Sequence, residues 1–210
     1  MNKEVVILAN GEFPVHPIPL SILNAAPFII CCDGASNQLL QRGITPHLII
    51  GDGDSISPEN RQRHLTIFKQ IKEQESNDLT KAVRHAYKSG AKKVHILGAT
   101  GKREDHTLGN ISLLMTYARK LEVKCYTNYG IFIPSEGNQT FKSFKGQQIS
   151  LFNFGATHMH AKNLLYPLSD FNELWQGTLN EATDTLFTIY ANGKYLVFKN
   201  YKEESVSRLK

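Results

Sequence analysis

Hydrophobic and polar positions follow two alternating periods along roughly the first 125 residues. Short apolar runs bounded by glycine, proline or polar residues predict strands, and apolar residues at helical spacing between them predict helices. The predicted strands cover residues 4–9, 28–32, 48–50, 66–70, 93–97 and 123–127. Because strands that alternate with helices favour a parallel sheet covered on both faces, this part of the chain is predicted to be an α/β domain.

Four helices are predicted between these strands. Gly43 ends the first, over residues 34–42, and Ser57 caps a second that Pro58 opens. The clearest helix, over residues 78–89, ends at Gly90, and its apolar face is formed by Leu79, Ala82, Val83, Ala86 and Tyr87. The last helix, over residues 105–120, is predicted to have one apolar face, formed by Leu108, Ile111, Met115 and Ala118.

The pattern changes after Asn128, where helical periodicity is weak and β-rich runs appear at residues 130–134, 139–144, 148–154 and 185–191. Asn192-Gly193 is a typical two-residue turn, so it predicts a hairpin of residues 188–191 with 195–199. We therefore expect an α/β domain over residues 1–128, followed by a small all-β, sandwich-like domain over residues 129–210. Residues 203–210 are predicted to fray.

Composition narrows the class of protein. The chain has 210 residues, of which 41% are hydrophobic, and a net charge of +5 that is spread along the sequence. No apolar run approaches the ~18–20 residues of a membrane helix, and the N-terminus lacks a signal-peptide pattern. The odd set of Cys31, Cys32 and Cys125 lies in apolar runs, which indicates reduced core residues of a cytoplasmic protein. Scattered positive charge does not predict nucleic-acid binding, but it suits a small anionic substrate.

Aspartates follow several of the predicted strands. Asp33 follows residues 28–32, and Asp52 and Asp54 follow residues 48–50. Such a pair between glycines is either a plain turn or a cation site. Ligands of open parallel sheets bind beyond the carboxyl ends of the strands, which favours the cation site. Asp78 could be only a first-turn acid of its helix.

The segment GATGKRED, residues 98–105, follows another strand. Its glycines let backbone N–H groups approach an anion, and Lys102 and Arg103 add positive charge. The spacing is not that of a P-loop. A solvated loop is the alternative, but beside carboxylates phosphate binding is favoured. His106 could cap, pack or contact substrate.

Taken in order, these motifs resemble the thiamine pyrophosphokinase family. The motifs are Asp33-Gly34, GDGDS at residues 51–55, Asn77-Asp78, and GATGKREDHTLGN at residues 98–110. The resemblance implies an α/β nucleotide-binding domain, a β-sandwich-like second domain, and a homodimer with active sites at the interface. The implied reaction moves the pyrophosphoryl group of ATP to thiamine with Mg²⁺, giving thiamine diphosphate and AMP. Nucleic acid and membrane are not expected partners.

The resemblance also implies roles for single residues. Asp52, Asp54 and Asp78 are expected to bind magnesium and, with Arg103 and Asp105, to support catalysis. The expected nucleotide-side residues are Asp33, Ser55, Gln74, Thr100, Gly101, Lys102, His106 and Asn110. The expected thiamine-side residues are Tyr166, Thr178, Leu179 and Asn180, with Trp175 a further aromatic candidate.

The chain departs from the family pattern at four positions. The threonine before the helix is Asn77, and the middle residue of GDxDS, often aromatic, is Gly53. In the second half, Asn163 replaces a glycine of a GLxYxL element, and Leu179 replaces the serine of a GxSNE element. The first two changes leave every carboxylate in place, whereas the last two bear on the acceptor pocket.

Two other functions fit part of the sequence. A DxD motif after a strand also serves metal-dependent nucleotide-sugar transferases, although these have no need of the GATGKREDH loop. A nucleotide-binding module without turnover is the second alternative, but such a module would tolerate loss of the carboxylates that this chain retains.

Overall fold

The structure, a computed structural model, describes residues 3–202, so the predicted fraying of residues 203–210 lies outside the described range. The chain divides into two compact units, residues 1–128 and residues 129–210. The first combines a parallel sheet with helices and the second is antiparallel β. The predicted fold class is confirmed.

The sheet of unit 1 (residues 1–128) is parallel, with the strand order β6-β5-β1-β2-β3-β4. Its strands are β1 (Glu4–Leu8), β2 (Ile29–Cys32), β3 (Leu48–Gly51), β4 (Phe68–Gln70), β5 (Lys93–Leu97) and β6 (Glu122–Tyr126). The order reverses beside β1, since β2 lies on one side of it and β5 on the other. The loops that leave β1 and β5 therefore diverge, and such a switch point is where open α/β sheets bind ligands.

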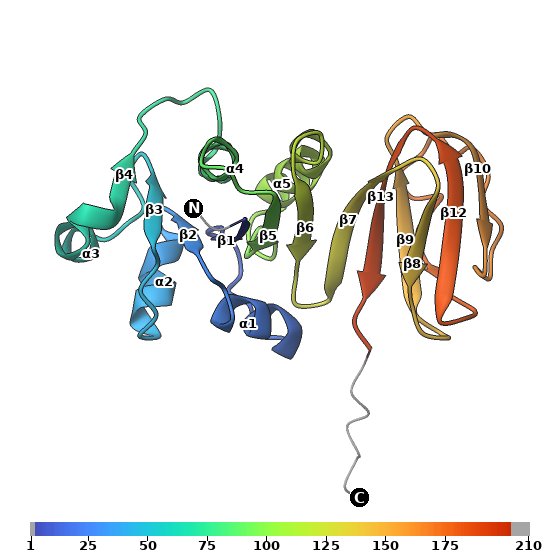
Figure 1. The fold of residues 1–210 in the computed structure, drawn as a ribbon, viewed down its shortest axis with the longest axis horizontal. Coiled ribbons are helices and arrows are strands. Elements are labelled where there is room, and N and C mark those ends of the chain that lie inside the picture. The colour runs from blue at the N-terminus through green and yellow to red at the C-terminus, as the bar shows by residue number, and fades with distance from the viewer. Residues whose placement is uncertain (1–2, 203–210) are drawn as a thin grey trace, which may run out of the picture. The chain divides into compact units, whose positions relative to one another are not determined.

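Helices cover both faces of this sheet. Figure 1 shows α1 and α2 on one side and α4 and α5 on the other. The helices are α1 (Pro17–Asn24), α2 (Ala35–Gln41), α3 (Pro58–Arg63), α4 (Asp78–Lys88) and α5 (Glu104–Tyr117). The sequence pattern missed α1 because its two prolines resemble a loop. They lie in its first turn, where no N–H is needed, and the His16 side chain accepts a hydrogen bond from the Ile18 N–H at 3.2 Å.

Two predicted apolar faces need correction. In α4 the predicted residues are buried except Tyr87, which is 44% exposed. In α5 the predicted face is wrong at Leu108, which is 69% exposed, and the buried residues are Leu114, Met115 and Tyr117. The first turns of α5 border a pocket, so only its second half packs as a core helix. Strand β4 is shorter than predicted because Leu65–Ile67 forms a 3₁₀ turn.

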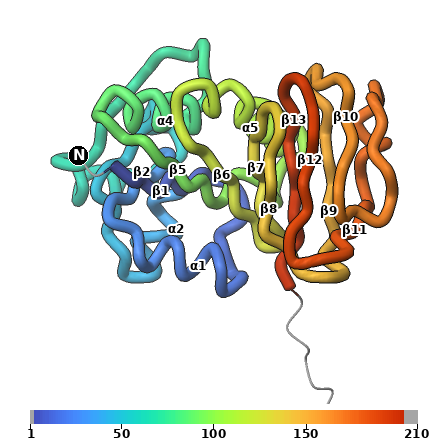
Figure 2. The backbone as a smooth tube through the Cα atoms, turned by 45° about the vertical axis from the view of Figure 1, so that its right-hand side comes forward, coloured from blue at the N-terminus to red at the C-terminus, as the bar shows by residue number. Residues whose placement is uncertain are grey.

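Unit 2 (residues 129–210) consists of two antiparallel sheets, and Figure 2 traces the chain through their strands. One has the order β11-β9-β13-β7, and the other is a 3-stranded sheet, β10-β12-β8. The strands are β7 (Gly130–Glu136), β8 (Gln139–Lys142), β9 (Gln148–Asn153), β10 (Thr157–Lys162), β11 (Asn180–Glu181), β12 (Leu186–Asn192) and β13 (Lys194–Asn200). Their inward side chains form one core that includes Leu151, Phe187, Ile189 and Tyr195.

The predicted hairpin at Asn192-Gly193 is wrong. Strand β12 pairs with β10 and β8, whereas β13 pairs with β7 and β9, so the chain crosses from one sheet to the other. Gly193 alone separates the two strands, at a φ of 112° that favours glycine. One linking residue is too short for the two-residue turn that the sequence suggested.

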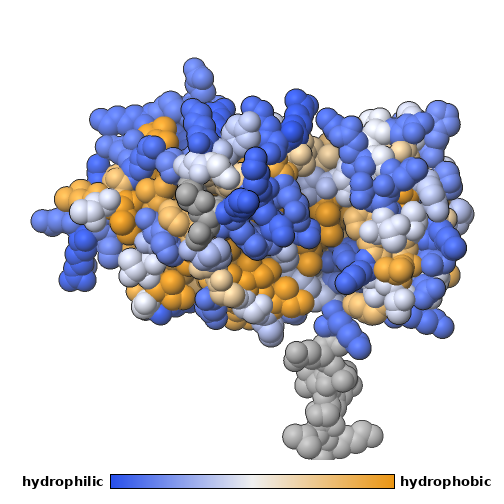
Figure 3. All heavy atoms as spheres, viewed as in Figure 1, coloured by the Kyte–Doolittle hydropathy of each residue, from blue (hydrophilic) through white to orange (hydrophobic). Residues whose placement is uncertain are grey.

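The surface and the cysteines are ordinary. In the view of Figure 3 hydrophilic residues cover most of the surface, and hydrophobic residues form separate small groups. Among residues 3–202, no helix has both the length and the apolar character needed to cross a bilayer. Cys31, Cys32 and Cys125 are free and buried, as predicted, and burial raises the pKa of the Cys125 thiol to about 12.

Candidate active site

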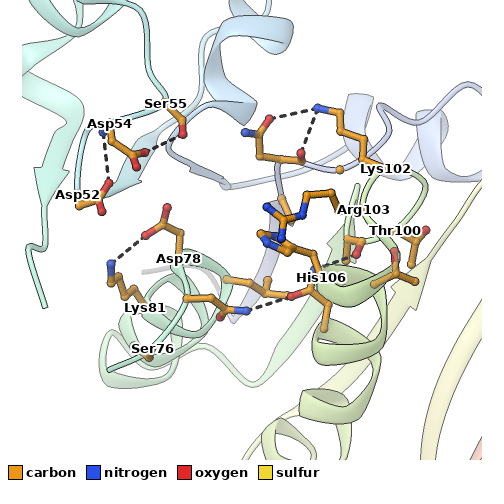
Figure 4. Close-up of a pocket in the computed structure, with 18 of the residues that line it drawn as sticks. Asp52, Asp54, Ser55, Ser76, Asp78, Lys81, Thr100, Lys102, Arg103 and His106 are labelled. Atoms are coloured by element: carbon orange, nitrogen blue, oxygen red, sulfur yellow. Dashed lines mark hydrogen bonds and ion pairs between the residues drawn. The ribbon is translucent and has the colours of Figure 1, made fainter. Parts of the chain in front are cut away.

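A pocket of about 460 Å³ lies at the carboxyl edge of the unit 1 sheet, and Figure 4 shows the side chains around it. The loops after β1, β3 and β5 and the first turns of α4 and α5 contribute to it. Its lining includes Asn10, Gly11, Asp52, Asp54, Ser55, Gln74, Asn77, Asp78, Lys81, Thr100, Lys102, Arg103, His106 and Asn110. Carboxylates and cations that are far apart in the sequence thus face one pocket.

The loop after β3 holds the aspartate pair through its own hydrogen bonds. The Asp54 N–H donates to Asp52 Oδ1 at 3.2 Å, and Gln74 Nε2 donates to Asp52 Oδ2 at 2.9 Å. The hydrogen bond from Gln74 is the main reason why the pKa of Asp52 lies below its ordinary range. Asp54 Oδ1 accepts a hydrogen bond from the Ser55 hydroxyl at 2.7 Å. Asp52 is therefore held as a charged acceptor at the pocket.

Asp33 lies beneath this loop and is 1% exposed. Its Oδ2 accepts a hydrogen bond from the Ser55 N–H at 2.9 Å, whereas its buried Oδ1 has no hydrogen-bond partner within residues 3–202. Its φ of 32° is unusual for a residue with a side chain. Burial is the largest of the causes that raise the pKa of Asp33. A buried carboxylate with a free oxygen at a strained backbone position is typical of a ligand site.

Asp78 opens α4 behind the cap residue Asn77, whose Oδ1 accepts a hydrogen bond from the Thr80 N–H at 2.9 Å. The Asp78 carboxylate pairs with Lys81 one turn later, with 3.0 Å between Oδ1 and Nζ. Burial raises the pKa of Asp78, and the Lys81 ammonium opposes that rise. Figure 4 shows Asp78 between Lys81 and the Asp52–Asp54 pair. Two charges of opposite sign are thus fixed at this end of the pocket.

The loop after β5 forms the cationic side of the pocket. Lys102 Nζ donates to the Asn10 carbonyl oxygen at 3.1 Å, which ties this loop to the one that follows β1. Gly11 lets the two loops approach, because a Cβ there would lie 2.4 Å from the Gly98 oxygen. Asn110 Nδ2 donates to the Ala99 carbonyl at 2.8 Å and anchors the loop on α5.

Arg103 and Asp105 pair with each other at the mouth of this loop. Two guanidinium nitrogens donate to the Asp105 carboxylate, at 3.1 and 2.6 Å, and both side chains are well exposed. The Arg103 guanidinium is the main cause that lowers the pKa of Asp105 to about 2. Arg103 lines the pocket and Asp105 does not, so Asp105 contacts the site through its partner.

The structure brings most of the predicted unit 1 residues to this pocket. Those that line it are Asp52, Asp54, Ser55, Gln74, Asp78, Thr100, Lys102, Arg103, His106 and Asn110. Asp33 lies below the lining, Gly101 forms the loop turn at a φ of 87°, and Asp105 points to Arg103. Asn10, Gly11 and Lys81 also line the pocket and were not predicted from the sequence. The strand-end rule that identified Asp33 would have identified the first two, and the i,i+3 spacing from Asp78 would have identified Lys81.

The carboxylates suit a hard divalent cation. Oxygens of Asp33, Asp52 and Asp54 all lie within 4.8 Å of one another. Hard cations such as Mg²⁺ prefer carboxylate oxygens and share their shell with substrate phosphates. The partnerless Asp33 oxygen adds a buried acceptor to this set. The donor chemistry therefore fits magnesium, and the three grouped carboxylates stand beside Asp78, which lines the same pocket.

A second cavity, of about 530 Å³, lies within unit 2 and is lined by all four residues predicted for the acceptor side, Tyr166, Thr178, Leu179 and Asn180, together with Trp175. Tyr166, Trp175 and Leu179 are 58%, 71% and 76% exposed, so this cavity offers apolar and aromatic surface to a ligand. Leu179 has a φ of 60°, an uncommon value for leucine. Asn180 is buried, and its amide bonds backbone groups.

An open parallel sheet with carboxylates and a basic loop on either side of one strand-end pocket is typical of one class of protein, the enzymes that act on phosphate-bearing ligands. Two family models narrow the class. Residues 20–127 match "Thiamin pyrophosphokinase, catalytic domain", and residues 130–198 match "Thiamin pyrophosphokinase, substrate-binding domain". The chain belongs to the thiamin pyrophosphokinase family, which confirms the resemblance noted in the sequence.

Individual proteins agree with the family match. The chain is 33% identical over 118 residues to the thiamine pyrophosphokinase of Bacillus subtilis (strain 168), a match that spans 53% of this chain and about half, 54%, of that relative. The crystal structure of the Bacillus subtilis protein has a TM-score of 0.79 at 22% identity and covers 96% of this chain and 100% of that one. Thiamin pyrophosphokinase from Candida albicans has a TM-score of 0.76 at 16% identity, with 96% and 90% covered. These solved structures establish the fold.

Proposed function

We propose that the chain is a thiamine pyrophosphokinase, which transfers the pyrophosphoryl group of ATP to the hydroxyethyl oxygen of thiamine. The observation that supports this most directly is the pocket in which Asp52 and Asp54 lie opposite Lys102 and Arg103. Carboxylates for a metal and cations for phosphate oxygens are the two parts that a transfer of this kind needs. Family membership supports thiamine as the acceptor.

In the proposed reaction the thiamine hydroxyl oxygen forms a bond to the β-phosphorus of ATP. The bond from that phosphorus to the oxygen bridging the α- and β-phosphates breaks, AMP leaves with the bridging oxygen, and the hydroxyl proton is released. The protein contributes positioning and charge stabilisation. Lys102 and Arg103 would bind phosphate oxygens, and the backbone turn at Gly101 would let N–H groups approach them.

Magnesium is the proposed cofactor, held by Asp52, Asp54 and Asp78 with Asp33 beside them. When bound, it would neutralise charge on the phosphates that are transferred. Gln74 and Ser55 would keep the oxygens of Asp52 and Asp54 in position through the hydrogen bonds described above. Asp105 would act by orienting Arg103.

The unit 2 cavity is the proposed source of thiamine contacts. Thiamine has two flat rings, one of them cationic, and aromatic faces attract such a ring. Tyr166 and Trp175 supply those faces, Leu179 an apolar wall and Thr178 a hydroxyl, while Asn180 would keep the Tyr166 segment in place.

The assembly and compartment follow from the same proposal. We expect a homodimer with active sites at its interface, and the exposed apolar side chains near this cavity support such an interface. Three free buried cysteines support a cytoplasmic location. Light scattering after size-exclusion chromatography would measure the assembly, and a strictly monomeric active protein would contradict the dimer.

The deciding experiment supplies the protein with ATP, Mg²⁺ and thiamine and separates the products by chromatography. Equal amounts of AMP and thiamine diphosphate are expected, and neither should form when thiamine is omitted. Formation of ADP with thiamine monophosphate, or of no product at any metal concentration, would contradict the proposed reaction.

A further inference from the structure

Lys81 is the most buried cation described at the pocket. It lies in α4, its side chain is 3% exposed, and it nevertheless contributes to the pocket lining. Burial of an ammonium group costs free energy unless partners compensate for the lost water. The one hydrogen bond that the Lys81 ammonium makes among the described residues goes to Asp78 Oδ1, at 3.0 Å. An ammonium has three N–H donors, so Lys81 retains donors that Asp78 does not use.

The charges around Lys81 are mostly negative. Asp78 lies between it and the Asp52–Asp54 pair, and all of these side chains line the same pocket. A fixed positive charge in that place offsets part of the field of the carboxylates. The field of the carboxylates attracts a bare metal ion, whereas the ammonium repels it. A metal–polyphosphate complex brings negative oxygens of its own, which can accept the remaining Lys81 donors.

We propose that Lys81 makes this pocket selective for a metal–polyphosphate complex over the free divalent cation. Lys81 keeps the free-metal affinity of the carboxylates low and provides a matching charge once phosphate oxygens arrive with the metal. It also fixes the direction of Asp78, so that the pocket is organised before the ligand binds. This inference deepens the proposed function and rests on it, because it takes the pocket to be the nucleotide site.

The test measures binding to the whole protein without turnover, by isothermal titration calorimetry. The probes are Mn²⁺ alone and Mn²⁺ with α,β-methylene-ATP, whose α–β link cannot be cleaved. Lys81→Met removes the charge at nearly the same length. The variant is expected to bind Mn²⁺ alone at least about fivefold more tightly than the wild type, because it lacks the positive charge that repels the cation from the same pocket. The same variant should bind the Mn²⁺–analogue complex at least about fivefold more weakly, because it loses a charge-assisted hydrogen bond.

Lys88→Met is the matched control, since Lys88 is an exposed residue of the same helix and loses the same charge. Its affinities should stay within about twofold of the wild type, because an exposed charge is screened. Lys81→Gln keeps a donor for Asp78 without the charge, and it takes over the test if circular dichroism shows that Lys81→Met does not fold. Unchanged or weaker binding of Mn²⁺ alone by the folded variant would overturn the inference about Lys81. A wild-type protein that binds no Mn²⁺–analogue complex would overturn the proposed function and this inference together.

Discussion

The side chain of Asn180 closes a pair of hydrogen bonds with the backbone of Tyr166. Its Nδ2 donates to the Tyr166 carbonyl at 2.9 Å, and its Oδ1 accepts from the Tyr166 N–H at 3.1 Å. Asn180 is 4% exposed, whereas Tyr166 is 58% exposed. A buried amide thus holds an exposed aromatic residue at the edge of the unit 2 cavity.

Replacement of Asn180 should therefore affect stability as well as binding. Asn180→Ala leaves the Tyr166 backbone groups without their partners, so we expect a loss of about 1–3 kcal/mol in the free energy of unfolding. Urea denaturation measures that loss. The KM for thiamine should rise and the KM for ATP should stay unchanged. An equal rise in the KM for ATP would place Asn180 outside the acceptor side.

The strained backbone at Leu179 predicts a stabilising change. Leu179→Gly removes a side chain from a φ of 60° and loses little buried surface, because Leu179 is 76% exposed. We expect the free energy of unfolding to rise by about 0.5–1 kcal/mol, since glycine adopts this conformation without steric cost. Ala182→Gly, at a buried position within the unit 2 core, should instead lower it. A lower melting temperature for Leu179→Gly would show that the side chain makes a stabilising contact.

The aspartate pair should matter for turnover far more than for folding. Asp54→Asn removes one proposed metal ligand and is expected to lower kcat by at least ~100-fold, the scale of a lost electrostatic stabiliser. Steady-state rates at saturating Mg²⁺ measure this. Glu59→Gln, at an exposed position of α3, is the control and should leave kcat unchanged. Near-normal turnover of Asp54→Asn would show that the aspartate pair forms only a turn and does not bind the metal.

Substitution of Arg103 tests the cationic side of the pocket, which is proposed to bind phosphate oxygens. Arg103→Lys retains the charge but loses the fork that holds Asp105 with two hydrogen bonds. We expect kcat/KM for ATP to fall about tenfold or more, with little change in melting temperature because the pair is exposed. Arg63→Lys, in an exposed pair with Glu59, should change neither quantity. Wild-type kinetics for Arg103→Lys would show that Arg103 is part of a solvated loop and does not bind phosphate.

The raised pKa of Asp33 predicts how the stability of the protein depends on pH. Because its pKa is raised in the folded protein, the native state binds a proton more readily than the unfolded chain does, and stability falls as pH rises from the ordinary value of 3.8 through the raised value. Asn has no charge to bury, so metal-free Asp33→Asn should be more stable than the wild type at pH 7. Each kcal/mol gained shifts the melting temperature by about 2–4 °C.

The check is a series of melting curves in a chelator. The advantage of Asp33→Asn should shrink as pH falls below the raised pKa and vanish below 3.8, where both native and unfolded wild type are protonated. An advantage that grows toward acid would mean that Asp33 is stabilised as a carboxylate.

Local patterns predicted the parallel sheet and most of the pocket, because strand ends in such a sheet must meet at one edge. Asp52, Asp54 and Lys102 could be placed in this way from sequence. Long-range geometry could not be predicted. The burial of Lys81 depends on what packs around α4, and the use of the Asn180 amide depends on a backbone segment 14 residues earlier. The failed hairpin has the same origin, since turn chemistry specifies a local bend and not the sheet that each strand joins.

Consecutive strands of unit 2 always belong to different sheets, from β7 to β13, and this affects how the unit folds. Within unit 2 no described strand pairs with the strand next to it in sequence, and the first strand pairs with the last. Such non-local pairing slows folding, because long loops must close before any strand pair forms. During synthesis β7 and β9 must wait until β13 has left the ribosome before their sheet can be completed. Until then the edges of β7 and β9 that face β13 have no partner, and such unpaired edges expose the newly made segment to aggregation.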